Sequence, residues 1–179
     1  DAEVVISIGA VGPLAMISQD GNTEEIVIGA GVTWTKLIDL IDQALPKLKP
    51  LRDVLLRFGS PQIRNLGTIG GNLINASPIA DSIPALIALD AVLEIAGPGG
   101  RRHVPIDGFY EGYKTMDLRD DEILVSIRLR PPLPNQYLHL SKVSKRRDMD
   151  ISTFTAAALL GVETGTVESA RIAMGGVGP

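Results

Sequence analysis

The chain has 179 residues, 45% of them hydrophobic and 21% charged, so it can bury a normal core in one domain or two small ones. Seventeen Lys and Arg against 21 Asp and Glu give a net charge of −4, which argues against nucleic-acid binding, because that binding needs clustered basic residues. There is no cysteine, so the chain cannot ligate an iron–sulfur cluster or a cysteine-type zinc ion. Its two histidines, His103 and His139, are too far apart in the sequence to form a metal-binding pair, and we expect no metal site.

The first third of the chain predicts a strand, a hairpin and two helices. Residues 3–8 are rich in β-branched side chains and predict a buried strand, and a turn-rich spacer within 14–28 predicts a hairpin. Thr33 is a good N-cap for a helix whose apolar residues recur at helical spacing until Pro46. A second helix is predicted over 48–58.

Residues 60–81 show neither the helical nor the strand period, and a long irregular stretch in a compact domain is usually a functional loop. Glycine lets a ligand approach the main chain closely, and exposed amides in such a turn can bind phosphate oxygens. Short polar side chains in the same stretch suit sugar hydroxyls. The glycines are Gly67, Gly70 and Gly71, and the polar residues are Thr68, Asn72, Asn75, Ser77 and Asp81. The pattern is neither a Walker nor a Rossmann motif, and by itself it could be only a structural turn.

The remaining chain predicts mainly strands, which gives an α+β fold. A short irregular or helical piece is expected between the second and third of these strands. The predicted elements are a helix over 84–89, a hairpin over 91–105, the irregular piece over 109–116, strands over 123–129 and 137–143, and a hairpin over 151–173. The proline-rich residues 131–135 are the expected boundary between a first subdomain, 1–132, and a smaller second one, 136–179.

Two motifs carry a resemblance to a known family. Residues 57–82 contain Ile-Arg-Asn-Leu-Gly-Thr-Ile-Gly-Gly-Asn followed by Ser-Pro-Ile-Ala-Asp, and they resemble the FAD-binding domain of molybdopterin-dependent hydroxylases. Residues 141–152, with Asp-Ile-Ser after a basic cluster, look most like flavoproteins of the bacterial xanthine dehydrogenase type. The resemblance covers essentially the whole chain. It implies the type-2 FAD-binding fold of the vanillyl-alcohol-oxidase and CO-dehydrogenase flavoprotein class, with a mixed or antiparallel sheet, helices, and the start of a C-terminal α+β subdomain.

The resemblance also implies which residues bind FAD, and it implies no catalytic residue. The Gly-Thr-x-Gly-Gly-Asn segment would wrap the cofactor through main chain and short side chains, and Asp81 would accept hydrogen bonds from its sugar-like chain. Phe58 would pack on a ring, Leu124 would form an apolar wall, and Lys142 would place a cation near the flavin or its phosphates. The full set is Phe58, Gly67, Thr68, Gly71, Asn72, Ile74, Asn75, Asp81, Leu124 and Lys142.

For three of these residues a plain structural role remains open. Phe58 and Leu124 could be core side chains, and Lys142, in an alternating strand, could be a solvated lysine. The basic and acidic residues of 146–150 are typical of an exposed ion-pair cluster that contributes little to stability.

The function that the resemblance implies is electron transfer by the FAD-dependent component of an oxidoreductase of purine catabolism, most similar to xanthine dehydrogenase. Electrons would pass from a molybdenum centre through [2Fe–2S] clusters to FAD and then to NAD or another acceptor, with molybdopterin and the clusters held by partner domains or subunits. The alternatives are a family member of the carbon monoxide dehydrogenase or aldehyde oxidase type, and a flavin-free binding or assembly module.

The family's glycine-rich pyrophosphate loop would precede the segment that matches 1–8, and its last helices would follow residue 179. We therefore expect a fragment that lacks part of the diphosphate site and is inactive alone. No apolar stretch reaches the ~20 residues that span a bilayer, and no basic signal-peptide region opens the chain, so we expect no membrane span and a cytoplasmic protein.

Overall fold

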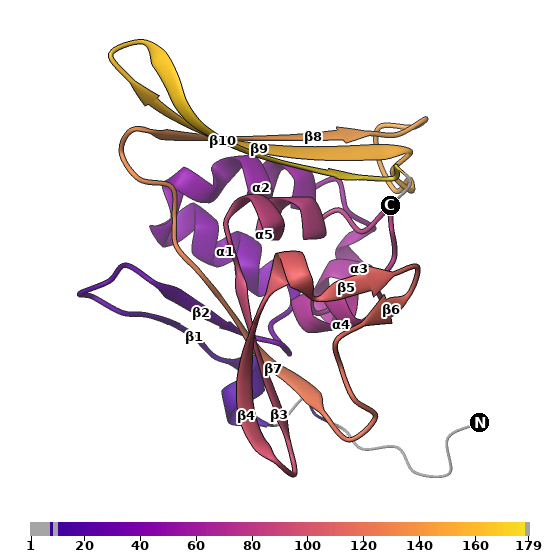
Figure 1. Cartoon of the computed structure of the whole chain (residues 1–179). Helices are drawn as coiled ribbons and strands as arrows, with labels where there is room; N and C mark the ends of the chain where they lie inside the picture. Colours follow the sequence, from indigo (N-terminus) through magenta and orange to yellow (C-terminus); the bar gives the residue numbers. More distant parts are fainter. Residues whose placement is uncertain (1–7, 9–10, 178–179) are drawn as a thin grey trace.

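The computed structural model describes residue 8 and residues 11–177, so the strand expected over 3–8 lies, apart from residue 8, outside the described part. The chain forms three layers: a five-stranded sheet, a central layer of short helices, and a three-stranded sheet (Figure 1). No helix in the described ranges is long and apolar enough to cross a membrane. The predicted α+β class is confirmed, with both sheets antiparallel.

The five-stranded sheet contributes one wall of the core. Its order is β1 (Ile17–Gln19), β2 (Ile26–Gly29), β7 (Ile123–Leu129), β3 (Val92–Gly97) and β4 (Gly100–Pro105). Leu93, Ile95 and Ile127 are fully buried on the face toward the helices. The hairpin predicted over 91–105 is confirmed by β3 and β4, and the predicted strand over 123–129 is β7. The hairpin predicted within 14–28 is formed by β1 and β2, but its first predicted residue, Leu14, lies in a 3₁₀ helix, Gly12–Ala15, because Pro13 fixes φ and has no amide to donate.

The helices lie between the sheets and begin at residues that cap them. In chain order they are α1 (Trp34–Ala44), a 3₁₀ turn (Pro46–Leu48), α2 (Lys49–Leu55), α3 (Pro61–Leu66), α4 (Ile69–Ile74) and α5 (Ile83–Ala88). The Thr33 side chain accepts from the Lys36 amide at 3.4 Å, and α1 ends just before Pro46, as predicted.

The expectation that 60–81 lacks regular structure is wrong, because α3 and α4 lie within it. Each helix begins at a hydroxyl cap: Ser60 accepts from the amide of Ile63 at 3.3 Å, and Thr68 accepts from the amide of Gly71 at 3.0 Å. Each has only six residues, less than two turns, so neither can display a helical repeat of apolar residues.

The three-stranded sheet covers the other side of the helical layer. It consists of β8 (Gln136–Val143), β9 (Phe154–Glu163) and β10 (Thr166–Gly175) in the order β10-β9-β8, and it packs on α2 and α5 (Figure 1). The piece expected to be irregular or helical over 109–116 follows a 3₁₀ turn (Ile106–Gly108) and forms a two-stranded ribbon, β5 (Tyr110–Gly112) with β6 (Thr115–Met116).

Candidate functional site

A cavity of about 410 Å³ opens beside the segment that carries the first sequence motif. Four parts of the chain form its wall: the turn after α2, helices α3 and α4 with the turn that follows them, strand β8, and the loop after β8. The lining residues are Phe58, Gly59, Ile63, Asn72, Asn75, Ser77, Ile79, Ala80, Asp81, Lys142, Met149, Asp150, Ile151 and Ser152. The volume lies in the range of small-molecule sites, and the wall mixes an aromatic ring with amide, carboxylate and ammonium groups.

A buried ion pair, Asp81 with Lys142, forms part of the wall of this cavity. The Asp81 carboxylate, in the turn before α5, accepts from Lys142 Nζ at 2.5 Å through Oδ2 and from Ser152 Oγ through Oδ1. The Lys142 side chain is 2% exposed and that of Asp81 is 4% exposed, so the interpretation of Lys142 as a solvated lysine is wrong. A carboxylate has about four acceptor positions, and therefore Asp81 keeps acceptor capacity for a ligand hydroxyl.

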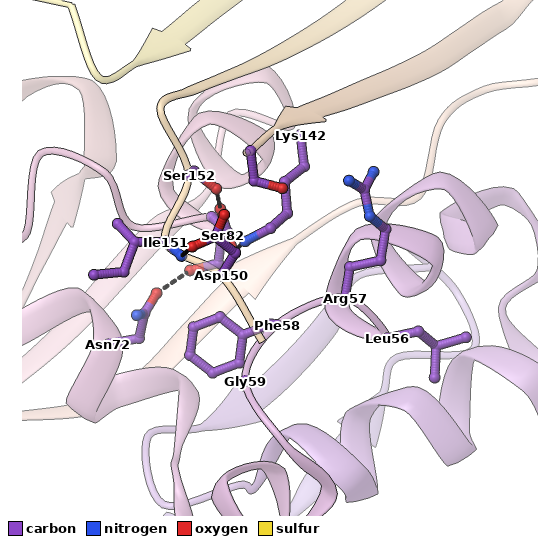
Figure 2. Close-up of polar contacts among 12 residues, drawn as sticks. Leu56, Arg57, Phe58, Gly59, Asn72, Ser82, Lys142, Asp150, Ile151 and Ser152 are labelled. Carbon is purple, nitrogen blue, oxygen red and sulfur yellow. Dashed lines mark hydrogen bonds and ion pairs between the residues drawn. The ribbon is translucent and has the colours of Figure 1, made fainter. Parts of the chain in front are cut away.

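The Asn72 side chain, which also lines the cavity, is fixed by a hydrogen bond as well. Its Oδ1 accepts from the hydroxyl of buried Ser82 at 2.7 Å (Figure 2). With the carbonyl engaged, the amide NH₂ of Asn72 is the group left to donate to a ligand. Asn75, one turn further along, is exposed and lines the same cavity.

The aromatic wall comes from Phe58 in the turn after α2. Its ring lines the cavity and packs on Trp34 with centroids 5.3 Å apart at 58°. Arg64 holds this turn, because its Nη1 donates to the carbonyl oxygens of Leu56, Phe58 and Gly59 at 3.2, 2.9 and 3.0 Å. Gly59 has φ +51°, a conformation that glycine adopts without strain. Phe58 therefore belongs both to the edge of the core and to the cavity wall.

The amides of the glycine segment, 67–71, were expected to be exposed, but three of them are engaged in hydrogen bonds within the protein. The amides of Gly67, Gly70 and Gly71 donate inside the protein: to the last turn of α3 at 2.7 Å, to the Ala30 carbonyl at 2.9 Å, and to the Thr68 hydroxyl at 3.0 Å. A Cβ at Gly70 would lie 2.6 Å from Ala30 Cβ, so this glycine allows α4 to approach the turn between β2 and α1. That expectation is wrong for these three amides, and any ligand contact here comes from carbonyls, α-carbons or side chains.

The cavity brings together half of the residues that the resemblance singles out. Phe58, Asn72, Asn75, Asp81 and Lys142 line it. The other five do not, and their cofactor contacts stay predictions: Gly67, Thr68 and Gly71 around the start of α4, and Ile74 and Leu124 in the core. Leu124 is 6% exposed in β7, so its packing in the core is the role that the structure shows.

Several residues that line the cavity, or that hydrogen-bond to its lining residues, were not predicted from the sequence. Ser82 and Ser152 orient Asn72 and Asp81, and Met149, Asp150 and Ile151 line the wall from the loop after β8. The sequence feature that could have pointed to this loop is the Asp-Ile-Ser at the end of the second motif.

The loop after β8 is stabilised by a carboxylate of its own. Asp150 accepts from the backbone amide of Arg146 at 2.7 Å and from its guanidinium at 3.3 Å. The amide hydrogen bond, with help from the guanidinium, lowers the pKa of Asp150 below its ordinary value. Within 146–150 the expected ion-pair cluster is therefore present as one pair, whose guanidinium is exposed and whose carboxylate is largely buried, and this carboxylate shapes the loop.

Comparison with known families matches both parts of the chain. Residues 1–132 match the family described as FAD binding domain in molybdopterin dehydrogenase, and residues 139–179 match the CO dehydrogenase flavoprotein C-terminal domain. The chain belongs to the molybdopterin dehydrogenase flavoprotein family. This membership confirms the resemblance that the two sequence motifs carry.

Individual members of this flavoprotein family align over most of the chain. The xanthine dehydrogenase FAD-binding subunit of Escherichia coli O157:H7 is 36% identical over 167 residues, 91% of this chain and 55% of that protein. The carbon monoxide dehydrogenase medium chain of Hydrogenophaga pseudoflava is 33% identical over 179 residues, 99% of this chain and 60% of that protein. The chain thus spans a little over half the length of these relatives.

Solved structures of the family share the fold. Carbon monoxide dehydrogenase from H. pseudoflava superposes with a TM-score of 0.82 at 32% identity, covering 91% of this chain and 55% of that one. Quinoline 2-oxidoreductase from Pseudomonas putida 86 gives a TM-score of 0.81 at 30% identity, covering 93% and 56%. The predicted fold class, that of the CO-dehydrogenase flavoprotein, is confirmed.

Proposed function

We propose that the chain is the FAD-binding part of a molybdenum-containing hydroxylase of the xanthine dehydrogenase type. In this function it would carry electrons from iron–sulfur clusters in partner domains or subunits through FAD to NAD or another acceptor. The observation that carries the proposal is the cavity, because its polar groups come from both sequence motifs, 57–82 and 141–152, of the flavoprotein family to which the chain belongs. We also propose 1–132 and 136–179 as its two subdomains. The cytoplasmic location and the role in purine catabolism stay predictions.

The residues of the cavity fit the chemical groups of a flavin nucleotide. The half-buried ring of Phe58 offers an aromatic face for a ring system, and Asp81 offers acceptor positions for the hydroxyls of a sugar-like chain. Asn72 presents an amide donor, and Lys142 is a cation with hydrogens beyond the one it gives to Asp81. When bound, the flavin supplies the redox chemistry, while the chain binds and orients it and shields it from water.

The experiment is the flavin content of the purified protein after incubation with FAD and removal of the free cofactor. Visible flavin absorbance in the wild type supports the proposal. Asp81→Ala and Gly71→Val should both retain less FAD. The Asp81 variant loses a hydroxyl acceptor, and the Gly71 variant places a branched side chain against Thr68 Oγ1, which a Cβ alone would already approach to 3.1 Å. Unchanged flavin content in both variants would contradict the assignment, and a colourless wild type that takes up no FAD would favour a flavin-free binding or assembly module.

A second candidate is the flavoprotein of a carbon monoxide dehydrogenase, because the H. pseudoflava medium chain aligns over 99% of this chain. The cavity serves either enzyme, since the substrate of a molybdenum centre binds elsewhere. Reduction of the FAD-loaded chain within its purified native assembly, by a purine or by carbon monoxide, distinguishes the two.

A further inference from the structure

The Asp81 carboxylate is held by two groups that differ in kind. Lys142 supplies the opposite charge from β8, through a long side chain with four rotatable carbons. Ser152 supplies a neutral hydroxyl from the loop after β8, through a short side chain that is 4% exposed as a residue. Charge neutralisation needs only the lysine, so the serine hydrogen bond has a different consequence: with both oxygens restrained, the carboxylate cannot rotate.

The loop that carries Ser152 is itself fixed at both ends. The Thr153 amide donates to the Val143 carbonyl at 2.9 Å and closes the loop just beyond Ser152. On the other side, the Ile151 amide donates to Asp150 Oδ1 at 3.1 Å, and Asp150 in turn accepts from the start of the loop. The hydroxyl that donates to Asp81 therefore comes from a loop that is hydrogen-bonded at both ends.

We propose that Ser152 is a positioning residue that holds the Asp81 carboxylate in the orientation its ligand hydroxyl requires. The inference rests on the proposed function, in which that ligand is FAD. Both Asp81 partners belong to residues 136–179, whereas Asp81 belongs to 1–132. The carboxylate is thus oriented only when the three-stranded sheet lies on the helical layer. Ligand binding in the cavity and docking of that sheet consequently stabilise each other.

The test is the dissociation constant of FAD, measured by quenching of flavin fluorescence with the full chain at a temperature where every variant is folded. Ser152→Ala should weaken FAD binding about tenfold, because a hydrogen bond to a charged group is lost. Ser152→Thr keeps the hydroxyl and should retain most of the affinity, and Ser152→Cys, a weaker donor, should fall between. This series keeps the inference testable if the alanine variant does not fold.

Two comparisons separate positioning from a general loss of structure. In an Asp81→Asn background, Ser152→Ala should change the affinity by less than about twofold, because the group through which it acts has already been altered. Ser126→Ala is the matched control: Ser126 is also 4% exposed and donates to a buried carboxylate, Glu94, at 2.6 Å, but it does not line the cavity. Its stability should fall and its FAD affinity should not.

The outcomes are distinguishable. Equal affinities of wild type and Ser152→Ala, or an undiminished effect in the Asp81→Asn background, would overturn the inference and leave the proposed function intact. Absence of FAD binding by the wild type would overturn the proposed function and this inference with it.

Discussion

Replacing Lys142 by methionine removes the positive charge from the most deeply buried ion pair among the described residues. The two side chains are 2% and 4% exposed, with Nζ 2.5 Å from the Asp81 carboxylate. Methionine keeps the length of the side chain and leaves the carboxylate buried with one neutral donor, Ser152. Breaking a buried pair in this way costs about 3–5 kcal/mol, against about 0–1 kcal/mol for an exposed pair.

The assay is urea unfolding of the FAD-free protein, with the free energy of unfolding obtained by linear extrapolation. Arg146→Met is the control, because its pair with Asp150 has a 75% exposed guanidinium side chain and should contribute little. The double variant Asp81→Asn/Lys142→Met should recover part of the loss, since it buries no charge. A loss below about 1 kcal/mol for Lys142→Met would refute the reasoning, because it would place the pair among solvated ones.

Two further predictions concern residues outside the cavity wall. Gly70→Ala should destabilise the chain by about 1–3 kcal/mol, because its methyl group would lie 2.6 Å from the carbonyl oxygen and the Cβ of Ala30, in the turn between β2 and α1. Urea unfolding measures this loss. The Ser126 hydrogen bond, with help from Arg101, lowers the pKa of Glu94 in the folded protein. The ionised Glu94 therefore stabilises the folded state at any pH above the pKa that this group has in the unfolded chain. This stabilisation is lost as the pH falls through the pKa of Glu94 in the folded protein. Ser126→Ala should therefore make stability less dependent on pH in the acidic range, as measured by unfolding at a series of pH values.

Each of these two predictions would be contradicted by a specific result. An unchanged unfolding midpoint for Gly70→Ala would mean that α4 is free to move away from the turn between β2 and α1. An unchanged pH profile in Ser126→Ala would mean that Arg101 and Arg128, and not the serine, hold the pKa of Glu94 down.

Local signals were sufficient for some of the regular elements, α1 and the β3–β4 hairpin among them. The hydroxyl of Thr33 and the ring of Pro46 bound α1 on both sides, and the glycines of 97–100 mark the turn between β3 and β4. These features are confirmed because the deciding residues are adjacent in sequence to the element they define. The longer second helix predicted over 48–58 ends earlier, at Leu55, where the turn held by Arg64 begins.

The cavity could not be predicted from local sequence patterns, because its residues come from distant parts of the chain. Lys142 and Asp81 are 61 positions apart, and alternation along β8 predicted a solvated side chain as readily as a buried one. Helices α3 and α4 have six residues each, which is too few for apolar residues to recur at helical spacing. The family resemblance identified Asp81 and Lys142 as site residues, but their direct pairing and the serines that orient the polar groups follow only from the fold.

A structure of the chain determined in the presence of FAD tests the central claim most directly. The account predicts flavin density in the cavity between Phe58, Asn72 and Asp81, with a hydroxyl of the sugar-like chain bonded to the Asp81 carboxylate. Density confined to the neighbouring cavity between the β5–β6 ribbon and the end of β10, which shares Ser77 and Ala80 with the candidate site, would contradict it, as would the absence of flavin density at a saturating concentration.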